Sequence, residues 1–371
     1  MNEALLKKLC HNLNNRGGFV PAYPIPEMFA LLEELFTEEE AKIAWMMPPT
    51  ATSLRDVADI LGRPSNDIVP LLESMADKGI VATRIQDNVT LYKLLALQPG
   101  IFEFQFMRGR DSDRDRRLAK LFRALSDAMS TGPKGRLPIP DDLTPAMRVI
   151  PVEETIEVGQ RVYTFEQISR YIDSADAIAV GHCYCHHEAY LLGEKTCDAP
   201  EYRCMSFGPG ATFTSERGIA RMISKEEARE IVKQCADKGL VHMSSNTSKH
   251  LEYLCNCCSC HCVPLKQFKK TGKFIGVATS AYIAKVDGEL CQGCDSCADI
   301  CPVQAISLAA ADDIPVVDKL MCIGCGVCAY HCPTDAISMN LREGYSHPPQ
   351  TSKDLREAII NDFMRAQTKQ G

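Results

Sequence analysis

Eight cysteines near the C-terminal end have the spacing of iron–sulfur ligands. Residues 291–302 read C-Q-G-C-D-S-C-A-D-I-C-P, and residues 322–333 read C-I-G-C-G-V-C-A-Y-H-C-P. Each run is C-x2-C-x2-C-x3-C-P, the bacterial pattern that holds [4Fe–4S] clusters. Every cysteine of the first run returns 31 residues later in the second. The segment is therefore an internal duplication that predicts two clusters.

The spacing also predicts which cysteines share a cluster. Each C-x2-C-x2-C loop supplies three thiolates, and Gly293, Gly324 and Gly326 allow the backbone to approach the cluster closely. The fourth cysteine of each run begins a helix that leads away, so it binds the other cluster. We assign to cluster one Cys291, Cys294, Cys297 and Cys332, and to cluster two Cys322, Cys325, Cys328 and Cys301. Zinc knuckles would need pairs of C-x2-C rather than two triplets that each end in Cys-Pro.

Nine further cysteines form two groups in the middle of the chain. The groups are Cys183, Cys185, Cys197 and Cys204, and then Cys255, Cys257, Cys258, Cys260 and Cys262. Successive side chains of an extended chain alternate, so Cys257 and Cys258 face opposite sides. We expect two metal sites, each completed from the first group. Three interpretations stay open: two more [4Fe–4S] clusters, one cluster with a structural zinc, or a single unusual cluster.

Composition limits what the rest of the chain can be. With 371 residues, 45% apolar and 24% charged, the chain is long enough for two or three globular domains. A net charge of −7 does not suggest nucleic acid as a partner. The N-terminus lacks a signal-peptide pattern, and no apolar stretch is long enough to span a membrane. Nineteen cysteines then indicate a reducing cytoplasm, with thiolates on metal rather than in disulfides.

The first 130 residues predict helices followed by a winged-helix pattern. Helices are expected around residues 28–36 and 38–47, and then over 53–61 and 64–78, before a hairpin at 80–97. The helix at 64–78 is net acidic, whereas recognition helices present Arg or Lys to DNA. We therefore favour packing or partner docking over DNA binding. A charged helix is expected over Arg108–Met129, with its arginines interleaved by aspartates and exposed to solvent.

The expected fold class is α+β with several domains. Strands are predicted at 148–156 and 177–182, and helices at 164–174 and 224–238, the last with Cys235 as a buried thiol. The expected segments are a helical and winged-helix-like domain (1–130), a linker (131–147), an α/β cysteine-rich middle domain (148–280), a ferredoxin-like 2[4Fe–4S] domain (281–342) and a C-terminal helical tail (343–371).

With these residues in hand, the chain resembles a family of anaerobe iron–sulfur proteins over roughly residues 30–340. The matching pieces are G-I-F-E-F-Q-F-M at Gly100, V-I-P-V-E-E-T-I at Val149, H-C-Y-C-H-H at His182, S-K-E-E-A at Ser224, K-G-L-V-H at Lys238 and L-C-N-C-C-S-C-H-C at Leu254. The family commonly has Arg where this chain has His186, and often Cys where it has His261. The ligand set of the middle sites therefore stays open. The resemblance implies a 4Fe-4S electron-transfer protein that is a subunit or partner of a larger anaerobic oxidoreductase.

We accordingly expect a relay of single electrons to or from a partner oxidoreductase, rather than a stand-alone enzyme. The sequence has no phosphate-binding or dinucleotide-binding loop and no acid–base or nucleophile constellation, so no organic cofactor and no catalytic residue are predicted. One alternative is a redox-sensing DNA-binding regulator that uses the winged helix. Another is a catalytic iron–sulfur subunit with a substrate site at the middle cysteines, where His186 or His261 would mark an iron that lacks a cysteine ligand.

Overall fold

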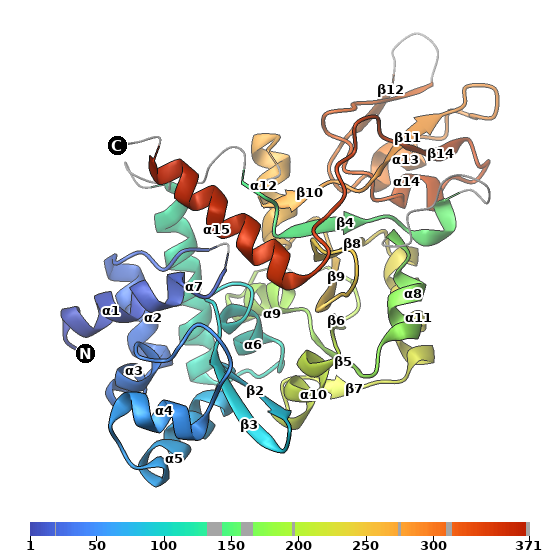
Figure 1. Cartoon of the computed structure of the whole chain (residues 1–371). Coiled ribbons are helices and arrows are strands. Elements are labelled where there is room, and N and C mark those ends of the chain that lie inside the picture. Colours follow the sequence, from blue (N-terminus) through green and yellow to red (C-terminus); the bar gives the residue numbers. More distant parts are fainter. Residues whose placement is uncertain are drawn as a thin grey trace. The chain divides into compact units, whose positions relative to one another are not determined.

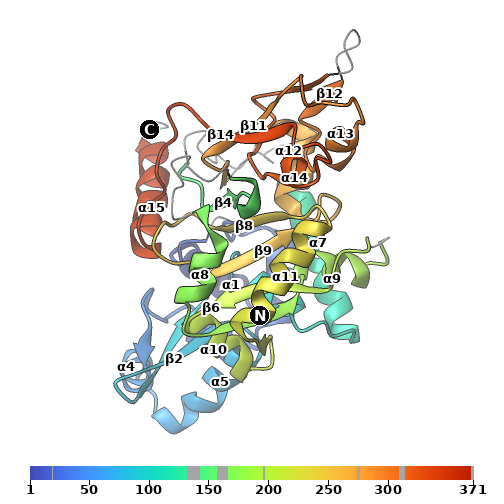
Figure 2. The same ribbon diagram turned by 90° about the vertical axis from the view of Figure 1, so that its right-hand side faces the viewer.

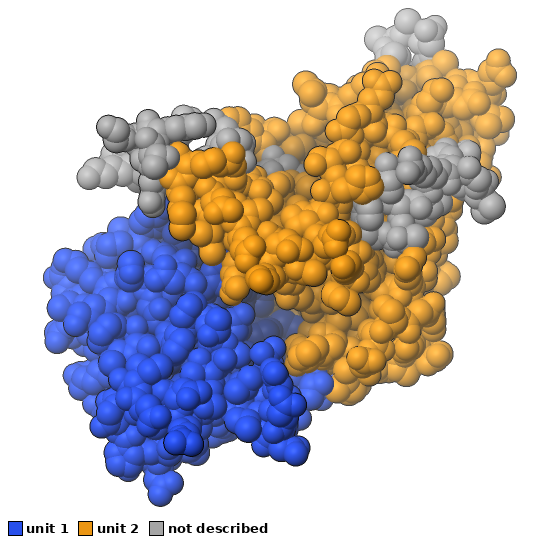
Figure 3. All heavy atoms as spheres, viewed as in Figure 1, with its two compact units in different colours: residues 1–141, 187–196, 212–221 blue, residues 142–186, 197–211, 222–371 orange. Residues whose placement is uncertain are grey.

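A computed structural model of the chain describes residues 1–18, 20–131, 143–156, 166–194, 197–273, 276–308 and 314–368 (Figure 1). The chain forms two compact units (Figure 3). Unit 1 contains residues 1–141, 187–196 and 212–221, and unit 2 contains residues 142–186, 197–211 and 222–371. Together the units hold a mixture of helices and sheets, so the α+β class is confirmed. Most of the expected linker, residues 132–142, lies outside the described residues.

Unit 1 begins with three helices. They are α1 (Glu3–Asn14), α2 (Pro26–Leu35) and α3 (Glu38–Ala44). The Thr37 side chain accepts a hydrogen bond from the backbone N–H of Glu40, and the Glu40 carboxylate accepts one from Thr37, which fixes the start of α3. This helix ends before the predicted Met47, because the side-chain amide of Asn12 takes up the carbonyls of Ala44 and Met47.

A small antiparallel sheet follows, with two helices between its first and second strands. The elements are β1 (Thr52–Ser53), α4 (Leu54–Leu61), α5 (Ser65–Asp77), β2 (Val81–Gln86) and β3 (Val89–Leu94), and the strand order is β1-β3-β2. Ser53 caps α4, and Gly62 ends it in the left-handed conformation. Asp87 and Asn88, both with positive φ, turn the hairpin between β2 and β3. Apart from β1, which the sequence does not predict, these helices and strands lie where the sequence predicts them.

The single charged helix expected over Arg108–Met129 is wrong at its start. The structure has α6 (Ile101–Phe106) and α7 (Asp113–Thr131) instead. Gly109 interrupts the helix with a φ of +64°. Ser112 then caps α7, because its hydroxyl accepts from the N–H of Asp115 while the Asp115 carboxylate accepts from the N–H of Ser112.

A seven-stranded sheet dominates unit 2 (Figure 2). In spatial order its strands are β10 (Val277–Ala278), β4 (Met147–Ile150), β8 (Val241–Ser245), β9 (Tyr253–Cys257), β6 (Tyr202–Phe207), β5 (Ile178–His182) and β7 (Arg221–Met222). From β4 to β5 all neighbours are antiparallel, and β10 is parallel to β4. The strand expected to run to Ile156 stops at Ile150, because Pro151 follows and a 3-10 turn begins at Glu153.

Two helices cover one face of this sheet, as Figure 2 shows. They are α8 (Ile168–Ser174) and α11 (Lys225–Asp237), and apolar side chains from both join a core with β5, β6 and β9. Ser224 caps α11 by accepting from the N–H of Glu227, as predicted. Cys235 on α11 is fully buried in this core, and burial raises the pKa of its thiol to about 12. The first residues of the expected helix at 164–174 lie outside the described residues.

The remaining helices outside the C-terminal repeat connect strands or close the chain. They are α9 (Tyr184–Leu191), α10 (Pro209–Glu216), α12 (Val263–Thr271) and α15 (Ser352–Thr368). Helix α15 falls within the expected C-terminal tail. Among the described residues, no helix combines the length and the apolar character that crossing a membrane requires.

The duplicated segment of unit 2 repeats a strand–helix–strand unit. Its elements are β11 (Tyr282–Val286), α13 (Ser296–Ile300), β12 (Ile306–Leu308), β13 (Pro315–Val317), α14 (Val327–Tyr330) and β14 (Ile337–Leu341). The outer strands β11 and β14 pair with each other, and so do the inner strands β12 and β13. Each half of the duplication therefore completes the sheets of the other half.

Candidate metal centres

The two cysteine loops of the duplication have matching backbones. Gly293 and Gly324, which are 31 residues apart, both have positive φ, at +66° and +71°. The same holds for Asp295 and Gly326, at +61° and +77°. A Cβ on Gly324 would collide with Ser280 and the carbonyl of Tyr282, so only glycine fits this tight part of the loop. The sequence repeat is thus also a repeat of loop conformation.

Four cysteines line one small cavity in the duplicated segment. They are Cys301, Cys322, Cys325 and Cys328, which are the four residues that the spacing assigns to cluster two. Burial, with the neighbouring thiols second, raises the pKa of Cys328 well above its ordinary value. The backbone N–H of Ala305 donates to Cys301 Sγ over 3.2 Å, the kind of bond that stabilises a cluster thiolate. The donor set and its enclosure fit a [4Fe–4S] cluster.

The other four cysteines of the duplication are less enclosed. Cys294 is exposed, Cys291 and Cys332 are half-buried, and Cys297 is buried. Burial raises the pKa of Cys297, and Cys291 and Cys294 contribute to the same shift as close neighbours. Hydrogen bonds from the hydroxyl and the backbone of Ser296 lower the pKa of Cys294. The described contacts thus bring the three loop cysteines together, and the assignment of Cys332 to them stays a prediction.

The duplicated segment is fixed to the large sheet within unit 2. The backbone N–H of Val152, just after β4, donates to the carbonyl of Cys325 over 2.9 Å. A Cβ on Gly239, at the end of α11, would lie 3.0 Å from Ile300 of α13. The Tyr330 hydroxyl of α14 donates to Asp237 over 2.6 Å. One of the cysteine loops is therefore in direct contact with the middle part of the chain.

The nine middle cysteines all lie in unit 2, and strand alternation divides them. Cys255 and Cys257 share one face of β9, and Cys258 follows on the other side. The pairing of Met205 with Leu254 places Cys204 of β6 beside Cys255. Hydrogen bonds join neighbouring side chains into a series, which we call the β9 thiol group: Cys183, Cys204, Cys255, Cys257 and Cys262.

The ionisation of the β9 thiol group is strongly perturbed. Hydrogen bonds from Cys204 and Cys257 lower the pKa of Cys255 to about 6 despite its burial. The hydrogen bond with Cys204, followed by burial, raises the pKa of Cys183 well above its ordinary value. Such an array of buried thiols, one of them readily ionised, is the chemistry of a soft-metal site.

A second group contains a histidine that the predicted ligand set omits. The ligand atoms of Cys197, Cys258, Cys260 and His261 lie within 4.8 Å of one another, and we call these residues the Cys3His group. Burial opposes ionisation of Cys258, but the Arg203 guanidinium and the hydrogen bond with His261 lower the pKa of this thiol to about 7. Cys185 is buried at the start of α9, and we assign it to neither group.

Arg203 is a residue of the middle sites that sequence reasoning missed. Its side chain is fully buried, donates from Nε to the carbonyl of Asn256 over 2.9 Å, and places Nη2 3.6 Å from Cys258 Sγ. The side-chain amide of Asn256 donates to the carbonyl of Arg203 over 2.7 Å, and its oxygen lies 2.6 Å from Nδ1 of His242. Both thiol groups lie near this cation. No spacing rule signals a lone arginine of this kind.

The neighbouring histidines have different surroundings. The ring of His186 packs edge-on against His261, with 5.1 Å between ring centroids, and burial followed by Arg203 lowers the pKa of His186. His187 lies 2.7 Å from the carbonyl of Arg110 through Nε2, which explains it as a structural residue of unit 1. Of the two histidines that could mark an unusual iron site, His261 lies among the thiols and His186 packs against its ring, and the marking role itself stays a prediction.

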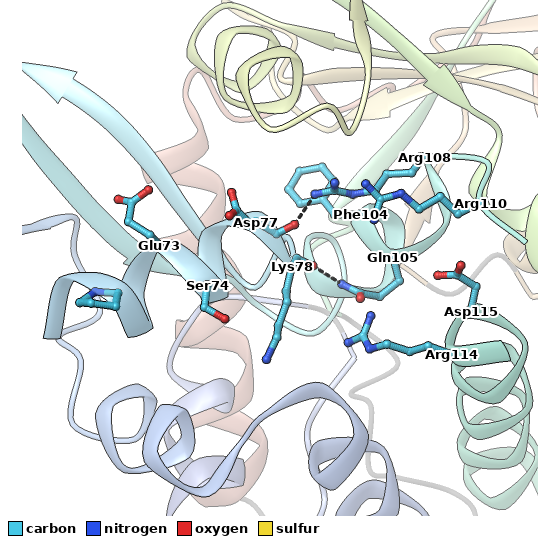
Figure 4. A pocket seen from close by; sticks show the side chains of 11 residues that line it. Glu73, Ser74, Asp77, Lys78, Phe104, Gln105, Arg108, Arg110, Arg114 and Asp115 are labelled. Atoms are coloured by element: carbon cyan, nitrogen blue, oxygen red, sulfur yellow. Dashed lines mark hydrogen bonds between the residues drawn. The ribbon is translucent and has the colours of Figure 1, made fainter. Parts of the chain in front are cut away.

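Unit 1 has a polar pocket of about 460 Å³ beside α5 (Figure 4). Both signs of charge occur on its wall, from Lys78, Arg108, Arg110 and Arg114, and from Glu73, Asp77 and Asp115. Arg108 donates to the carbonyl of Asp77, and Lys78 pairs with Glu40 at 2.6 Å. Because its charges are mixed and many are already paired, we assign this pocket no ligand.

Comparison with known protein families identifies the C-terminal part of the chain. Residues 290–336 match the family model of the 4Fe-4S dicluster domain. A search of curated proteins found no match to the chain. The chain therefore contains a ferredoxin-type domain that binds [4Fe–4S] clusters, which supports an iron–sulfur electron-transfer role. The winged-helix and middle parts of the expected family stay predictions.

Proposed function

We propose that the protein relays single electrons between a partner protein and an oxidoreductase, through the two clusters of the dicluster domain and one further cluster at the β9 thiol group. The observation that carries the proposal is the duplicated C-x2-C-x2-C-x3-C-P loop, with its repeated backbone and its match to the dicluster domain. When bound, each [4Fe–4S] cluster supplies a one-electron couple. The chain's own residues hold, enclose and position these groups.

The cavity that Cys301, Cys322, Cys325 and Cys328 line supports our assignment of cluster two. By the symmetry of the repeat, Cys291, Cys294, Cys297 and Cys332 hold cluster one. The exposed Cys294 makes cluster one the more accessible of the two. We therefore place the docking surface of a redox partner at the loop around residues 291–297.

The β9 thiol group offers five thiols, one more than a [4Fe–4S] cluster needs. The contact between Val152 and Cys325 supports a route from cluster two into the middle part of the chain. In this proposal cluster one exchanges electrons with the redox partner, and the middle cluster lies at the other end of the route as electron acceptor or donor. The resemblance to anaerobe iron–sulfur proteins agrees with such a subunit.

Metal analysis and spectroscopy of the anaerobically purified protein test this proposal. We expect about twelve irons and twelve sulfides per chain, and dithionite should produce three electron paramagnetic resonance signals. Cys325→Ser and Cys257→Ser should each remove one different signal, and Cys10→Ser, which alters a buried thiol of unit 1, should remove none. About eight irons, with Cys257→Ser spectroscopically unchanged, would exclude the middle cluster.

The N-terminal elements support a winged-helix-like interpretation, because two helices separate β1 from the β2–β3 hairpin and the strand order is β1-β3-β2. The arginines of α7 do not form a free cationic stripe. Arg116 pairs with Asp111, Arg117 with Glu34, and Arg123 with Glu194. We therefore propose protein docking rather than DNA binding for unit 1. A salt-dependent gel shift with genomic fragments that showed sequence-specific binding would overturn this choice.

A further inference from the structure

The Cys3His group is assembled from two loops that adjacent strands bring together. Cys197 precedes β6, whereas Cys258, Cys260 and His261 follow β9. Strands β6 and β9 are antiparallel neighbours, with Met205 opposite Leu254. The beginning of one strand therefore lies beside the end of the other. This topology explains why residues some 60 positions apart in the chain place their ligand atoms within 4.8 Å of one another.

We propose that the Cys3His group binds a single zinc ion through Cys197, Cys258, Cys260 and His261. The donor spacing carries this inference. Zinc–sulfur bonds of about 2.3 Å and zinc–nitrogen bonds of about 2.0–2.1 Å at a tetrahedral angle place the two donors about 3.6 Å apart. Nδ1 of His261 lies 3.7 Å from Cys258 Sγ. The imidazole donor of His261 also distinguishes this group from the all-thiol β9 thiol group.

The surrounding charges fit this ion. One Zn²⁺, three thiolates and a neutral imidazole carry a net charge of −1, which needs a partner cation on the side of the buried Cys258 and His261, whereas Cys260 is exposed to solvent. Arg203 supplies the compensating charge, since it is fully buried with Nη2 3.6 Å from Cys258 Sγ. The buried His186 ring packs edge-on against His261 and holds the plane of the ligand ring. Three cysteines, one histidine and no open position describe a structural zinc site.

The site goes beyond the electron-transfer proposal, because zinc has no redox chemistry. It would close the loop before β6 onto the loop after β9. That closure would hold Cys257 and Cys258 on opposite sides of the chain and so keep the β9 thiol group apart from the zinc ligands. In this arrangement a metal ion of fixed valence holds in place the loops next to the β9 thiol group.

Zinc K-edge X-ray absorption of the anaerobically purified wild-type chain tests the proposal without any substitution. We expect about one zinc per chain, with three sulfur neighbours at about 2.3 Å and one nitrogen at about 2.0–2.1 Å. Zinc bound adventitiously at the dicluster loops would show four sulfur neighbours. A wild-type protein without zinc, or with four sulfur neighbours around it, would overturn the proposal.

Two variants and a matched control extend the test. His261→Cys should keep the zinc and change its shell to four sulfurs, whereas Cys260→Ser should reduce zinc from about one per chain to near zero with iron and sulfide unchanged. Cys235→Ala, which alters a buried thiol outside both groups, should leave the zinc, iron and sulfide contents unchanged. A loss of about four irons in Cys260→Ser would instead indicate a cluster there. The dicluster signals are read in the same samples, so failure of the zinc proposal is distinguishable from failure of the electron-transfer proposal.

Discussion

At the scale of single residues, Arg203 is a buried cation that acts on thiols of both middle groups. It is fully buried, and both the β9 thiol group and Cys258 raise the pKa of its guanidinium. A buried cation of this kind is stable only beside negative charge. Thiolates in a low-dielectric interior likewise need a cation to stay ionised. Arg203 therefore interacts electrostatically with both thiol groups. The thiol that its guanidinium contacts within hydrogen-bond distance is that of Cys258.

Replacing this cation should make a neighbouring cluster harder to reduce. In Arg203→Met the positive charge disappears, so the added electron is less favoured and the reduction potential of the middle cluster should fall by on the order of 100 mV. A redox titration followed by electron paramagnetic resonance measures this shift. Arg170→Met, which removes an exposed arginine of unit 2, is the control and should leave all potentials unchanged. Unaltered metal content together with unaltered potentials in Arg203→Met would show that the charge of Arg203 does not tune the middle cluster.

The cysteines of the sites were predictable, but their partners were not. Spacing alone points to the dicluster ligands, and strand alternation predicts that Cys257 and Cys258 separate, which the structure confirms. His261 lies in the same string, yet only the fold shows that it faces Cys197. Arg203 depends on the register between β6 and β9, which sets it beside Asn256. Such cross-strand neighbours leave no trace in local spacing.

At the scale of secondary structure, helix α11 joins the middle sheet to the dicluster domain. Gly239 ends this helix with a φ of +67°, and Gly272 ends α12 with a φ of +66°. The two glycines differ in their surroundings. A Cβ on Gly239 would meet Ile300 at 3.0 Å, whereas one on Gly272 would meet only Met321 Sδ at 3.8 Å.

This difference gives a matched pair of substitutions. Gly239→Ala and Gly272→Ala should share a left-handed strain of about 1–2 kcal/mol. Gly239→Ala should lose a further 1–3 kcal/mol, roughly, because the methyl group pushes α13 away from α11. Anaerobic unfolding in guanidinium, followed by the visible absorbance of the clusters, compares the two midpoints. Equal midpoints would show that α11 does not support the dicluster domain.

Helix boundaries were predictable where the cap residues were clear. Ser53 and Ser224 mark the starts of α4 and α11, and the structure confirms both. The start of α7 was not predicted. Reciprocal hydrogen bonds between Ser112 and Asp115 mark this start in the structure. In the sequence, a continuous run of charged residues around them indicates one longer helix instead. Periodicity detects that a helix exists better than it detects where the helix begins.

At the scale of the whole molecule, the chain divides into units that sequence order does not delimit. Residues 187–196 and 212–221 belong to unit 1, although they lie between strands of the unit 2 sheet in the sequence. Arg217 explains part of this, since it pairs with Glu73 and Asp77 of α5 at 2.8 Å each. An ion pair across some 140 positions is not predictable from composition or periodicity.

Each unit has its own spectroscopic reporter. The single tryptophan, Trp45, lies in unit 1, and all the proposed metal ligands lie in unit 2. Unit 1 also contains a buried carboxyl group, Glu103, which accepts a hydrogen bond from the N–H of Gly100 over 2.6 Å. Burial raises the pKa of Glu103 from 4.5 to about 7.

This carboxyl group should make the stability of unit 1 depend on pH. Below pH 4.5 it is protonated in both the folded and the unfolded chain, so folding has no penalty; as the pH rises through about 7, the folded chain must bury a charge. Unfolding followed by Trp45 fluorescence should therefore show stability falling between about pH 4.5 and 7, where the unfolded chain ionises Glu103 and the folded chain does not, by on the order of 3 kcal/mol. Glu103→Gln, which can still accept from Gly100, should remove most of this slope. The cluster absorbance, which reports on unit 2, should respond to pH alike in both proteins. A variant that kept the wild-type slope in Trp45 fluorescence would contradict the assignment to Glu103.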